Sequence, residues 1–276
     1  MTCKIEQIFI FGSTGMLGNY ISAFFSKKSQ FKVININFRI TNTTIHDLEN
    51  VLIQNGIDDK TCIINCIGQI PQRNQDNKTY ILVNSIFPHL LWNICTRHGS
   101  KMIQPTTDCV FSGRRIEGNY TENDNHDEDG LYGMSKSLGE PYDCTIIRTS
   151  IIGREIYNKK SFLEWVITNG ENNGEINGWS NHYWNGITCL EYSKLIFKII
   201  NENLFWTGVR HISSPNAVSK YELASFIRDV FGLNLKINKV ECSEIINKTL
   251  KSNYENIYNI KDLFGQIMDL KTFNLV

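Results

Sequence analysis

A tyrosine and a lysine four residues apart could deliver a proton to a ketone during its reduction. Tyr132 and Lys136 stand in the run Tyr-Gly-Met-Ser-Lys, and on a helix they lie one turn apart on the same face. A phenol that acts as a proton donor needs its high pKa lowered, and a nearby ammonium favours the phenolate. The spacing is also common in surface pairs, so the surrounding chain has to support the chemistry.

A threonine upstream of this pair could orient the carbonyl group. Thr107 follows a predicted strand over residues 101–104 and Pro105. Because the carboxyl ends of strands form the ligand crevice of an open α/β sheet, we expect its hydroxyl to hydrogen-bond a substrate carbonyl beside Tyr132. Thr107 would orient the substrate, Tyr132 would donate the proton, and Lys136 would lower the phenol pKa and hold the cofactor ribose.

A glycine-rich turn near the N-terminus predicts a dinucleotide site. Gly12, Gly15 and Gly18 follow an apolar segment and open a predicted helix. They would allow a tight turn, close approach of a pyrophosphate and helix–strand packing, and the helix N-terminus attracts phosphates. The spacing differs from GxGxxG, and such glycines can also be only structural. Cofactor contacts are expected from Gly12, Thr14, Gly15, Met16, Leu17, Gly18, Cys66 and Gly68.

The residues after the second predicted strand indicate which dinucleotide binds. An acidic residue there favours NAD, whereas an arginine can pair with the 2′-phosphate of NADP. The chain has Arg39 and no acid before Asp47. We therefore predict NADPH (NADP) as the cofactor, with an ordinary solvated arginine as the alternative.

Strands and helices alternate along the first half of the chain. Apolar strands are predicted over 5–11, 31–36, 61–67, 101–104 and 143–148, and helices over 15–27, 45–54, 80–98 and 132–140. This alternation is typical of βαβ units. We predict an α/β fold with a Rossmann-like doubly wound parallel sheet, in which residues 1–150 bind NADP and carry the catalytic residues.

The alternation loosens beyond about residue 150. Residues 169–186 have the composition of loops, followed by a helix over 190–201 and a strand over 208–212. Ser219 is an expected N-cap for a helix over 221–231 that Gly232 ends. Residues 151–276 are predicted to form mainly a small α/β substrate lobe, with some segments returning to the first domain.

Composition excludes several classes of partner. Lys plus Arg and Asp plus Glu number 28 each in 276 residues, so no overall charge would attract nucleic acid or an acidic membrane. Without a secretory signal or a long apolar run, the protein is expected to be soluble and intracellular. Its 8 cysteines are scattered, without zinc spacing, and predict reduced thiols and no metal site.

Five motifs together carry a resemblance to a known family. They are GSTGMLG (12–18), TTDCVFSG (106–113), YTENDN (120–125), YGMSKSLGE (132–140) and IIRTSIIG (146–153). In this order and spacing they resemble the dTDP-4-dehydrorhamnose reductase family of extended short-chain dehydrogenases, and the similarity extends to SKYELA (219–224). The resemblance implies hydride delivery from NADPH to C4 of a 4-keto-6-deoxyhexose on a nucleoside diphosphate, with catalysis by Thr107, Tyr132 and Lys136.

The resemblance also implies further site residues. Asn84 would support the lysine in the cofactor site. Substrate contacts are expected from Asp108, Val110, Phe111, Arg148, Asn181 and Trp184. The family includes dimers, so a homodimer is left open.

Two departures from the family pattern concern the substrate. Cys109 stands where the family usually has tyrosine. In related epimerase-reductases that make UDP-rhamnose, a cysteine at the matching position is an acid in ring epimerisation, but the lysine that those enzymes use is absent from 161–165. A small buried residue is an equal alternative for Cys109. The segment 178–186 resembles the matching segment of reductases that act on UDP-linked 2-acetamido-2,6-dideoxy-L-hexoses. Its aromatic side chains would either stack on the base or sugar of the ligand or form a structural cluster.

Three functions remain open at this stage. The leading one is reduction of the C4 ketone of a UDP-2-acetamido-2,6-dideoxy-hexulose, giving UDP-N-acetyl-L-rhamnosamine, with C3 epimerisation by Cys109 as an open addition. The second is a dTDP- or UDP-4-dehydrorhamnose reductase that makes L-rhamnose. The third is a non-catalytic NADP-binding subunit similar to the regulatory β subunit of methionine adenosyltransferase, because fold alone does not establish activity.

Overall fold

Six parallel strands form the main sheet of the computed structural model, in the order β10-β5-β4-β3-β1-β2. The structure describes residues 4–28, 30–40, 44–73, 76–157, 159–255 and 258–275. The strands are β1 (Gln7–Phe11), β2 (Lys32–Ile36), β3 (Thr61–Asn65), β4 (Lys101–Thr106), β5 (Thr145–Arg148) and β10 (Gly208–His211). From β1 the chain moves first to β2 on one side and then to β3, β4 and β5 on the other. This reversal places a ligand crevice beyond the carboxyl ends of β1 and β3.

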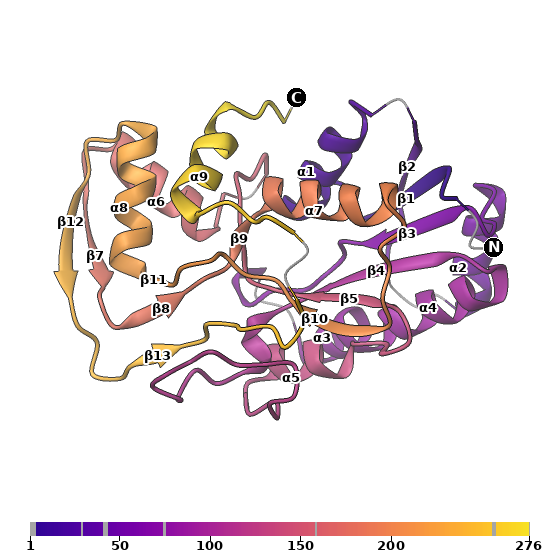
Figure 1. The fold of residues 1–276 in the computed structure, drawn as a ribbon, viewed down its shortest axis with the longest axis horizontal. Helices are drawn as coiled ribbons and strands as arrows, with labels where there is room; N and C mark the ends of the chain where they lie inside the picture. The colour runs from indigo at the N-terminus through magenta and orange to yellow at the C-terminus, as the bar shows by residue number, and fades with distance from the viewer. Residues whose placement is uncertain are drawn as a thin grey trace.

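Helices cover both faces of the sheet (Figure 1). On one face lie α1 (Met16–Phe25) and α7 (Cys189–Asn201); on the other lie α2 (Ile45–Gln54), α4 (Phe87–His98) and α5 (Leu131–Leu138). Side chains that alternate along β1 separate accordingly, as a strand requires. Ile8 and Ile10 pack in the cluster that holds Tyr20 of α1 and Tyr192 of α7, whereas Phe9 and Phe11 pack with Leu48 and Leu91 of α2 and α4. The predicted doubly wound α/β fold is confirmed.

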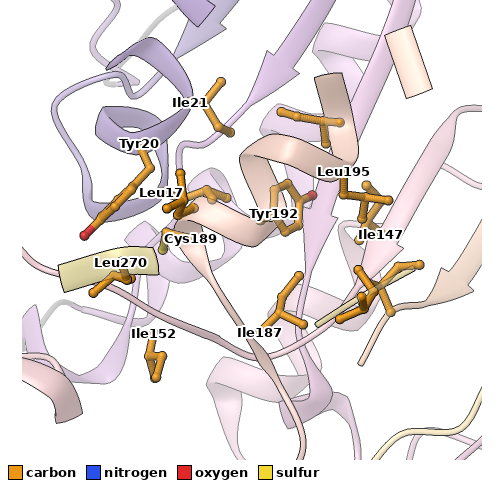
Figure 2. Packing of buried hydrophobic residues seen from close by; sticks show 14 of the residues in the cluster. Leu17, Tyr20, Ile21, Ile147, Ile152, Ile187, Cys189, Tyr192, Leu195 and Leu270 are labelled. Atoms are coloured by element: carbon orange, nitrogen blue, oxygen red, sulfur yellow. The ribbon is translucent and has the colours of Figure 1, made fainter. Parts of the chain in front are cut away.

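The first of these clusters joins the two halves of the chain. Figure 2 shows Leu17 and Ile21 of α1 beside Tyr192 and Leu195 of α7, while the ring of Tyr20 points toward Leu270 of α9 (Leu263–Thr272). Burial of one such large apolar side chain stabilises the fold by about 1.5–3 kcal/mol. Since α7 and β10 come from beyond residue 150 and pack on the main sheet, the chain returns to the first domain after it has entered the C-terminal lobe.

The C-terminal lobe contains short paired strands and three helices among the described residues. Its helices are α6 (Phe162–Glu171), α8 (Lys220–Phe231) and α9 (Leu263–Thr272). Its strands are β6 (Ile151–Ile152), β7 (Glu175–Trp179), β8 (His182–Trp184), β9 (Ile187–Thr188), β11 (Val218–Ser219), β12 (Lys236–Val240) and β13 (Ile246–Asn247). They pair as β11-β8-β13, β12-β7 and β6-β9. Figure 1 shows α8 lying against β7 and β12 at the end of the molecule away from β2.

The prediction that residues 169–186 form loops is wrong. This segment contains the end of α6 and the strands β7 and β8. β7 alternates buried and exposed residues, with Ile176 and Gly178 buried, and it pairs with β12 in register from Glu175–Lys236 to Trp179–Val240. The pairing joins segments about 60 residues apart, so local composition rich in Gly and Asn concealed it.

The predicted helices are largely present. α2 has the predicted bounds, and α8 begins with a capping box between Ser219 and Glu222 and ends at Gly232 in the left-handed conformation. The expected helix over 80–98 is instead composite: α3 (Asn77–Tyr80), a π-helical segment η2 (Ile81–Ile86) and α4. Two short 3-10 helices, η1 (Pro71–Arg73) and η3 (Asp108–Val110), follow β3 and β4. No helix within the described ranges is long and apolar enough to cross a bilayer.

Candidate active site

Thr107 and Tyr132 meet at the carboxyl end of β4. Thr107 is the N-cap of η3, and its Oγ1 accepts a hydrogen bond from the Cys109 N–H at 3.1 Å. Tyr132 lies in the first turn of α5, with its phenol near the Thr107 side chain. Burial raises the pKa of Tyr132, although the nearby Thr107 hydroxyl opposes the rise. The phenol is therefore protonated at neutral pH, as a proton donor must be.

Lys136 lies one turn further along α5 and is 9% exposed. Its Nζ donates to the Pro105 carbonyl at 3.4 Å, and burial lowers its pKa to about 8. We predicted that this ammonium would lower the pKa of Tyr132, but it is not among the leading groups that shift that pKa. Burial dominates at both residues, so in the protein alone the lysine does not create a phenolate.

Asn84 connects the loop after β3 to the catalytic helix. It lies in the π-helical segment, a form that occurs often at functional sites. Its carboxamide accepts from the Gln69 N–H at 2.8 Å, donates to the Gln69 carbonyl at 2.9 Å and contacts Ser135 Oγ at 3.0 Å. These groups, rather than the Lys136 amine, are its hydrogen-bond partners, so any support that it gives to the lysine acts through α5.

The glycine-rich turn has the geometry that close phosphate approach requires. Gly12 has a φ of +70°, and a Cβ there would lie 2.9 Å from the Cys66 carbonyl carbon. A Cβ on Gly18 would lie 2.1 Å from the Gly12 oxygen, whereas one on Gly15 would meet only that oxygen at 3.3 Å. α1 begins at Gly15 without a side-chain cap or an acidic residue in its first turn. Its first N–H groups are thus available to an anion.

Two buried polar atoms in the same crevice lack partners among the described residues. They are Gln69 Nε2, beyond the end of β3, and Thr106 Oγ1, at the end of β4. Buried polar groups are nearly always hydrogen-bonded, so a ligand in this crevice would supply the partners that these two atoms lack. Sequence analysis did not identify them, since neither residue belongs to a motif for cofactor contacts. Together with the glycine turn, they fit a dinucleotide cofactor.

The other expected cofactor residues surround this crevice. Thr14 is exposed in the turn, Cys66 and Gly68 are half-buried in the loop after β3, and Arg39 is exposed three positions beyond β2. Met16 is half-buried at the start of α1, while Leu17 is 7% exposed and packs in the core. Leu17 would therefore reach a cofactor only through its backbone.

Asp108 and Cys109 follow Thr107 into the site. Asp108 is 5% exposed, and its Oδ1 accepts from Thr107 Oγ1 at 3.1 Å and from Cys109 Sγ at 3.6 Å. Burial raises the pKa of the Asp108 carboxyl and raises that of the Cys109 thiol to about 12. Cys109 is half-buried and carries its proton at neutral pH.

Two lysines of the C-terminal lobe face this pair, and sequence analysis assigned a role to neither. Lys248 Nζ donates to Glu128 Oε2 at 2.9 Å, and Lys220 is the first residue of α8. Both ammonium groups lower the pKa of Asp108, opposing its burial. More than 100 residues separate these lysines from Asp108 in the sequence, so no local spacing could reveal the cluster.

The three apolar residues among the predicted substrate contacts are buried. Val110 and Phe111 are 1% and 0% exposed and pack with Tyr120 and Leu250, and the Phe111 and Tyr120 rings stack at 4.3 Å. Trp184 is 4% exposed within the main core. In the structure each of these side chains packs in a hydrophobic core cluster, and their contact with the substrate stays a prediction.

Arg148 and Asn181 also have structural partners. Arg148 is 1% exposed and donates to Glu140 at 2.7 Å, to His211 at 2.9 Å and to His126 at 2.7 Å. These partners compensate its buried charge, and its contact with the substrate stays a prediction. Asn181 donates to the Cys242 carbonyl at 2.7 Å and accepts from its N–H at 3.0 Å, which connects β8 to the segment after β12.

The cysteines and other potential metal ligands are dispersed. Within the described ranges, no three His, Cys, Asp or Glu side chains gather as a metal site. The free cysteines there are Cys62, Cys66, Cys95, Cys109, Cys144, Cys189 and Cys242. Cys3 lies outside the described residues.

Known proteins similar to this chain agree with the fold. The chain is 26% identical over 258 residues to the spore coat polysaccharide biosynthesis protein SpsK of Bacillus subtilis (strain 168), covering 91% of this chain and 88% of that protein. The dTDP-4-dehydrorhamnose reductase of Bacillus anthracis, solved in complex with NADP, superposes with a TM-score of 0.81 at 20% identity, covering 97% of this chain and 99% of the other. The corresponding reductase of Yersinia enterocolitica gives 0.78 at 19% identity, with 96% and 98% covered.

A family model matches nearly the whole chain. The model described as RmlD substrate binding domain aligns with residues 6–261, a span that includes the glycine turn, the catalytic helix and most of the C-terminal lobe. The chain therefore belongs to the RmlD substrate binding domain family.

Proposed function

We propose that the protein uses NADPH to reduce the C4 ketone of a nucleotide-linked 4-keto-6-deoxy sugar. The observation that carries the proposal is the proximity of Thr107 to the protonated phenol of Tyr132, one helical turn from Lys136 on α5. In this proposal residues 1–150 bind the cofactor and residues 151–276 mainly bind the substrate. The NADP bound in the B. anthracis structure supports the choice of cofactor.

The chemistry requires little movement of the protein's own groups. When bound, NADPH supplies the hydride to C4. The Thr107 hydroxyl and the Tyr132 phenol hydrogen-bond the ketone oxygen, and the phenol proton moves to that oxygen as negative charge develops on it. With a pKa of about 8, Lys136 is mostly charged at neutral pH and would hold the cofactor ribose.

The sugar that we favour is a UDP-2-acetamido-2,6-dideoxy-hexulose, which would give UDP-N-acetyl-L-rhamnosamine. Its support is the resemblance over residues 178–186 and the polysaccharide pathway in the name of the B. subtilis relative. The alternative, reduction of dTDP- or UDP-4-dehydrorhamnose to an L-rhamnose sugar, is supported by the solved relatives, which are dTDP-4-dehydrorhamnose reductases. Cys109 keeps a proton two residues from Thr107, which supports it as the acid for C3 epimerisation.

The experiment mixes the purified protein with NADPH and each keto sugar, follows the loss of NADPH absorbance and identifies the product by NMR. Oxidation of NADPH with the acetamido sugar supports the favoured substrate, and the C3 configuration of the product tests Cys109. Binding of NADPH without reduction of either sugar would favour the regulatory class, which the intact Thr107–Tyr132–Lys136 set argues against.

A homodimer is part of the proposal. The outer face of η2, α4 and α5 exposes apolar side chains, with Ile86 45% and Leu138 62% exposed, and Leu90 lines the same surface hollow. Exposed apolar patches often mark protein contacts. Analytical ultracentrifugation should give a dimer, and Leu138→Glu should shift it toward the monomer.

A further inference from the structure

Glu128 lies just before the catalytic helix and divides its carboxylate between two partners. Its Oε1 accepts from the N–H of Gly130, the N-cap residue of α5, at 3.0 Å. Its Oε2 accepts from Lys248 Nζ at 2.9 Å. α5 has no side-chain cap and no acidic residue in its first turn. Glu128 therefore supplies the negative charge that stabilises this helix end, and it does so while paired with a lysine of the C-terminal lobe.

The first turn of α5 packs closely against Glu128. A Cβ on Gly133, the residue after Tyr132, would overlap both the Cys109 carbonyl oxygen and the Glu128 side chain. The Glu128 N–H also donates to the Val110 carbonyl at 3.2 Å, which fixes its backbone to η3. Because packed segments of this kind transmit displacements, a movement of Glu128 would move the turn that carries Tyr132.

Lys248 is held in place by the lobe. It directly follows β13, which pairs with β8. Asn247, the last residue of β13, donates its N–H to the Gly113 carbonyl and its Nδ2 to the Ile116 carbonyl, both at 2.8 Å. Figure 1 shows β13 beside the loop between η3 and α5. Lys248 therefore reaches Glu128 from the strands of the lobe and not from the main sheet.

The pair is charged and largely shielded from water. The side chains of Glu128 and Lys248 are each 21% exposed. Burial opposes the charge of Lys248, but its neighbours Cys109, Glu128 and Asp108 together raise the pKa of the amine, so it is an ammonium at neutral pH. Exposed ion pairs contribute little, whereas charge-assisted hydrogen bonds are short and directional. This pair can therefore fix the position of the helix relative to the lobe.

We propose that Glu128 and Lys248 are positioning residues that hold the first turn of α5, and with it the Tyr132 phenol, in place against the lobe. The inference rests on the proposed function for the role of Tyr132. Since the sugar would be held mainly by the lobe and the proton donor by the first domain, a link between the two keeps the phenol within reach of the ketone oxygen. The two residues act through α5 and not by contact with the substrate.

The test compares the steady-state kinetics of the full-length wild type and Lys248→Met on the keto sugar that the wild type reduces. Lys248→Met should lower kcat by at least about 5-fold and change the KM for sugar and NADPH by less than about 2-fold, because a displaced proton donor slows the chemical step. Lys248→Arg, which keeps the charge, should keep kcat within about 2-fold of the wild type. The double variant Glu128→Gln/Lys248→Met should be no slower than the slower single variant, since both changes remove the same link.

The matched control is Lys194→Met, which removes another half-buried lysine that pairs across elements, with Asp269 of α9 at 2.6 Å, but does not contact α5. It should keep the wild-type kcat. Hydrogen exchange of a peptide that covers residues 130–134, followed by mass spectrometry, tests the same link without any reaction. Exchange should be at least about 3-fold faster in Lys248→Met, because the helix start opens more often, and unchanged in Lys194→Met.

The proposal is overturned if Lys248→Met, folded by circular dichroism, keeps the wild-type kcat. A higher KM for the sugar at unchanged kcat, or single effects that multiply in the double variant, would also overturn it, because the lysine would then act on the substrate directly. If the wild type reduces neither keto sugar, the proposed reaction fails and hydrogen exchange alone decides. Faster exchange at the start of α5 in Lys248→Met would then support the positioning pair, and unchanged exchange would overturn it.

Discussion

The crevice at the ends of β1 and β3 and the cavity of about 560 Å³ among α6, β7 and α8 of the C-terminal lobe present different groups to a ligand. The crevice offers backbone N–H groups at the start of α1, with glycines where a side chain would block approach. The cavity offers aromatic side chains and the ammonium of Lys220. Backbone groups depend on the path of the chain, whereas side chains can be exchanged on an unchanged backbone. We therefore expect nucleotide specificity to vary in the lobe and cofactor binding to depend on the turn.

The catalytic pair belongs to the first of these regions, and its loss should have the largest effect. Tyr132→Phe removes the proton donor, and loss of general acid catalysis lowers kcat by about 10²- to 10⁴-fold. NADPH affinity measured by fluorescence should change little. Tyr142→Phe, at an exposed tyrosine beyond α5, is the control. Full activity of Tyr132→Phe would contradict the assigned role.

Two tryptophans of the lobe test which of its aromatic side chains support the fold. Trp184 is 4% exposed and Trp179 is 46% exposed. Trp184→Ala should lower the free energy of unfolding by about 3–5 kcal/mol, because a large buried ring leaves a cavity, whereas Trp179→Ala should lower it by less than about 1 kcal/mol. Urea denaturation measures both. Equal losses would mean that the two rings do not differ in role.

The buried histidine at the end of β10 should make stability depend on pH. Burial, reinforced by Arg148, lowers the pKa of His211 to about 4. Arg148 donates to its Nε2 at 2.9 Å, so the neutral ring donates from Nδ1 to the Tyr120 carbonyl at 2.9 Å. Between pH 6.5 and about 4 the unfolded chain binds a proton that the folded chain does not, and stability falls as the pH drops.

The expected loss across this window is up to about 3 kcal/mol for a pKa shift of this size. Urea denaturation of the wild type at several pH values measures it, and His211→Gln should show a smaller slope. His46→Gln, at an exposed position in α2, should keep the wild-type slope. An unchanged slope in His211→Gln would assign the effect to other groups.

The smallest expected effects come from alanine substitutions at two glycines of the turn, which should change different properties of the protein. Gly18→Ala places a Cβ 2.1 Å from the Gly12 oxygen, and such overpacking costs about 1–3 kcal/mol of stability. Gly15→Ala meets only one oxygen at 3.3 Å, so the fold should be kept while NADPH affinity falls because the methyl group stands where phosphate would approach. Thermal denaturation and NADPH titration measure the two effects. Normal NADPH affinity in Gly15→Ala would place the phosphates elsewhere.

Much of the first region could be predicted from the sequence alone. The alternation of apolar segments predicted the parallel sheet and α2 with its exact bounds, and α8 was predicted nearly to the residue because its cap, Ser219, is a local signal. The glycine turn and the Tyr132–Lys136 spacing were equally readable, since each motif lies within a single turn or helix. Short-range geometry follows directly from residue types that are neighbours in the chain.

Only the tertiary structure decided the rest of the site. Arg148, Phe111 and Trp184 lie in or beside motifs, but their burial depends on what packs over them, which spacing does not show. Lys220 and Lys248 reach Asp108 from the lobe, and β7 exists because β12 pairs with it. Such contacts join segments far apart in sequence, and their positions follow from the packing of the whole chain rather than from any local pattern.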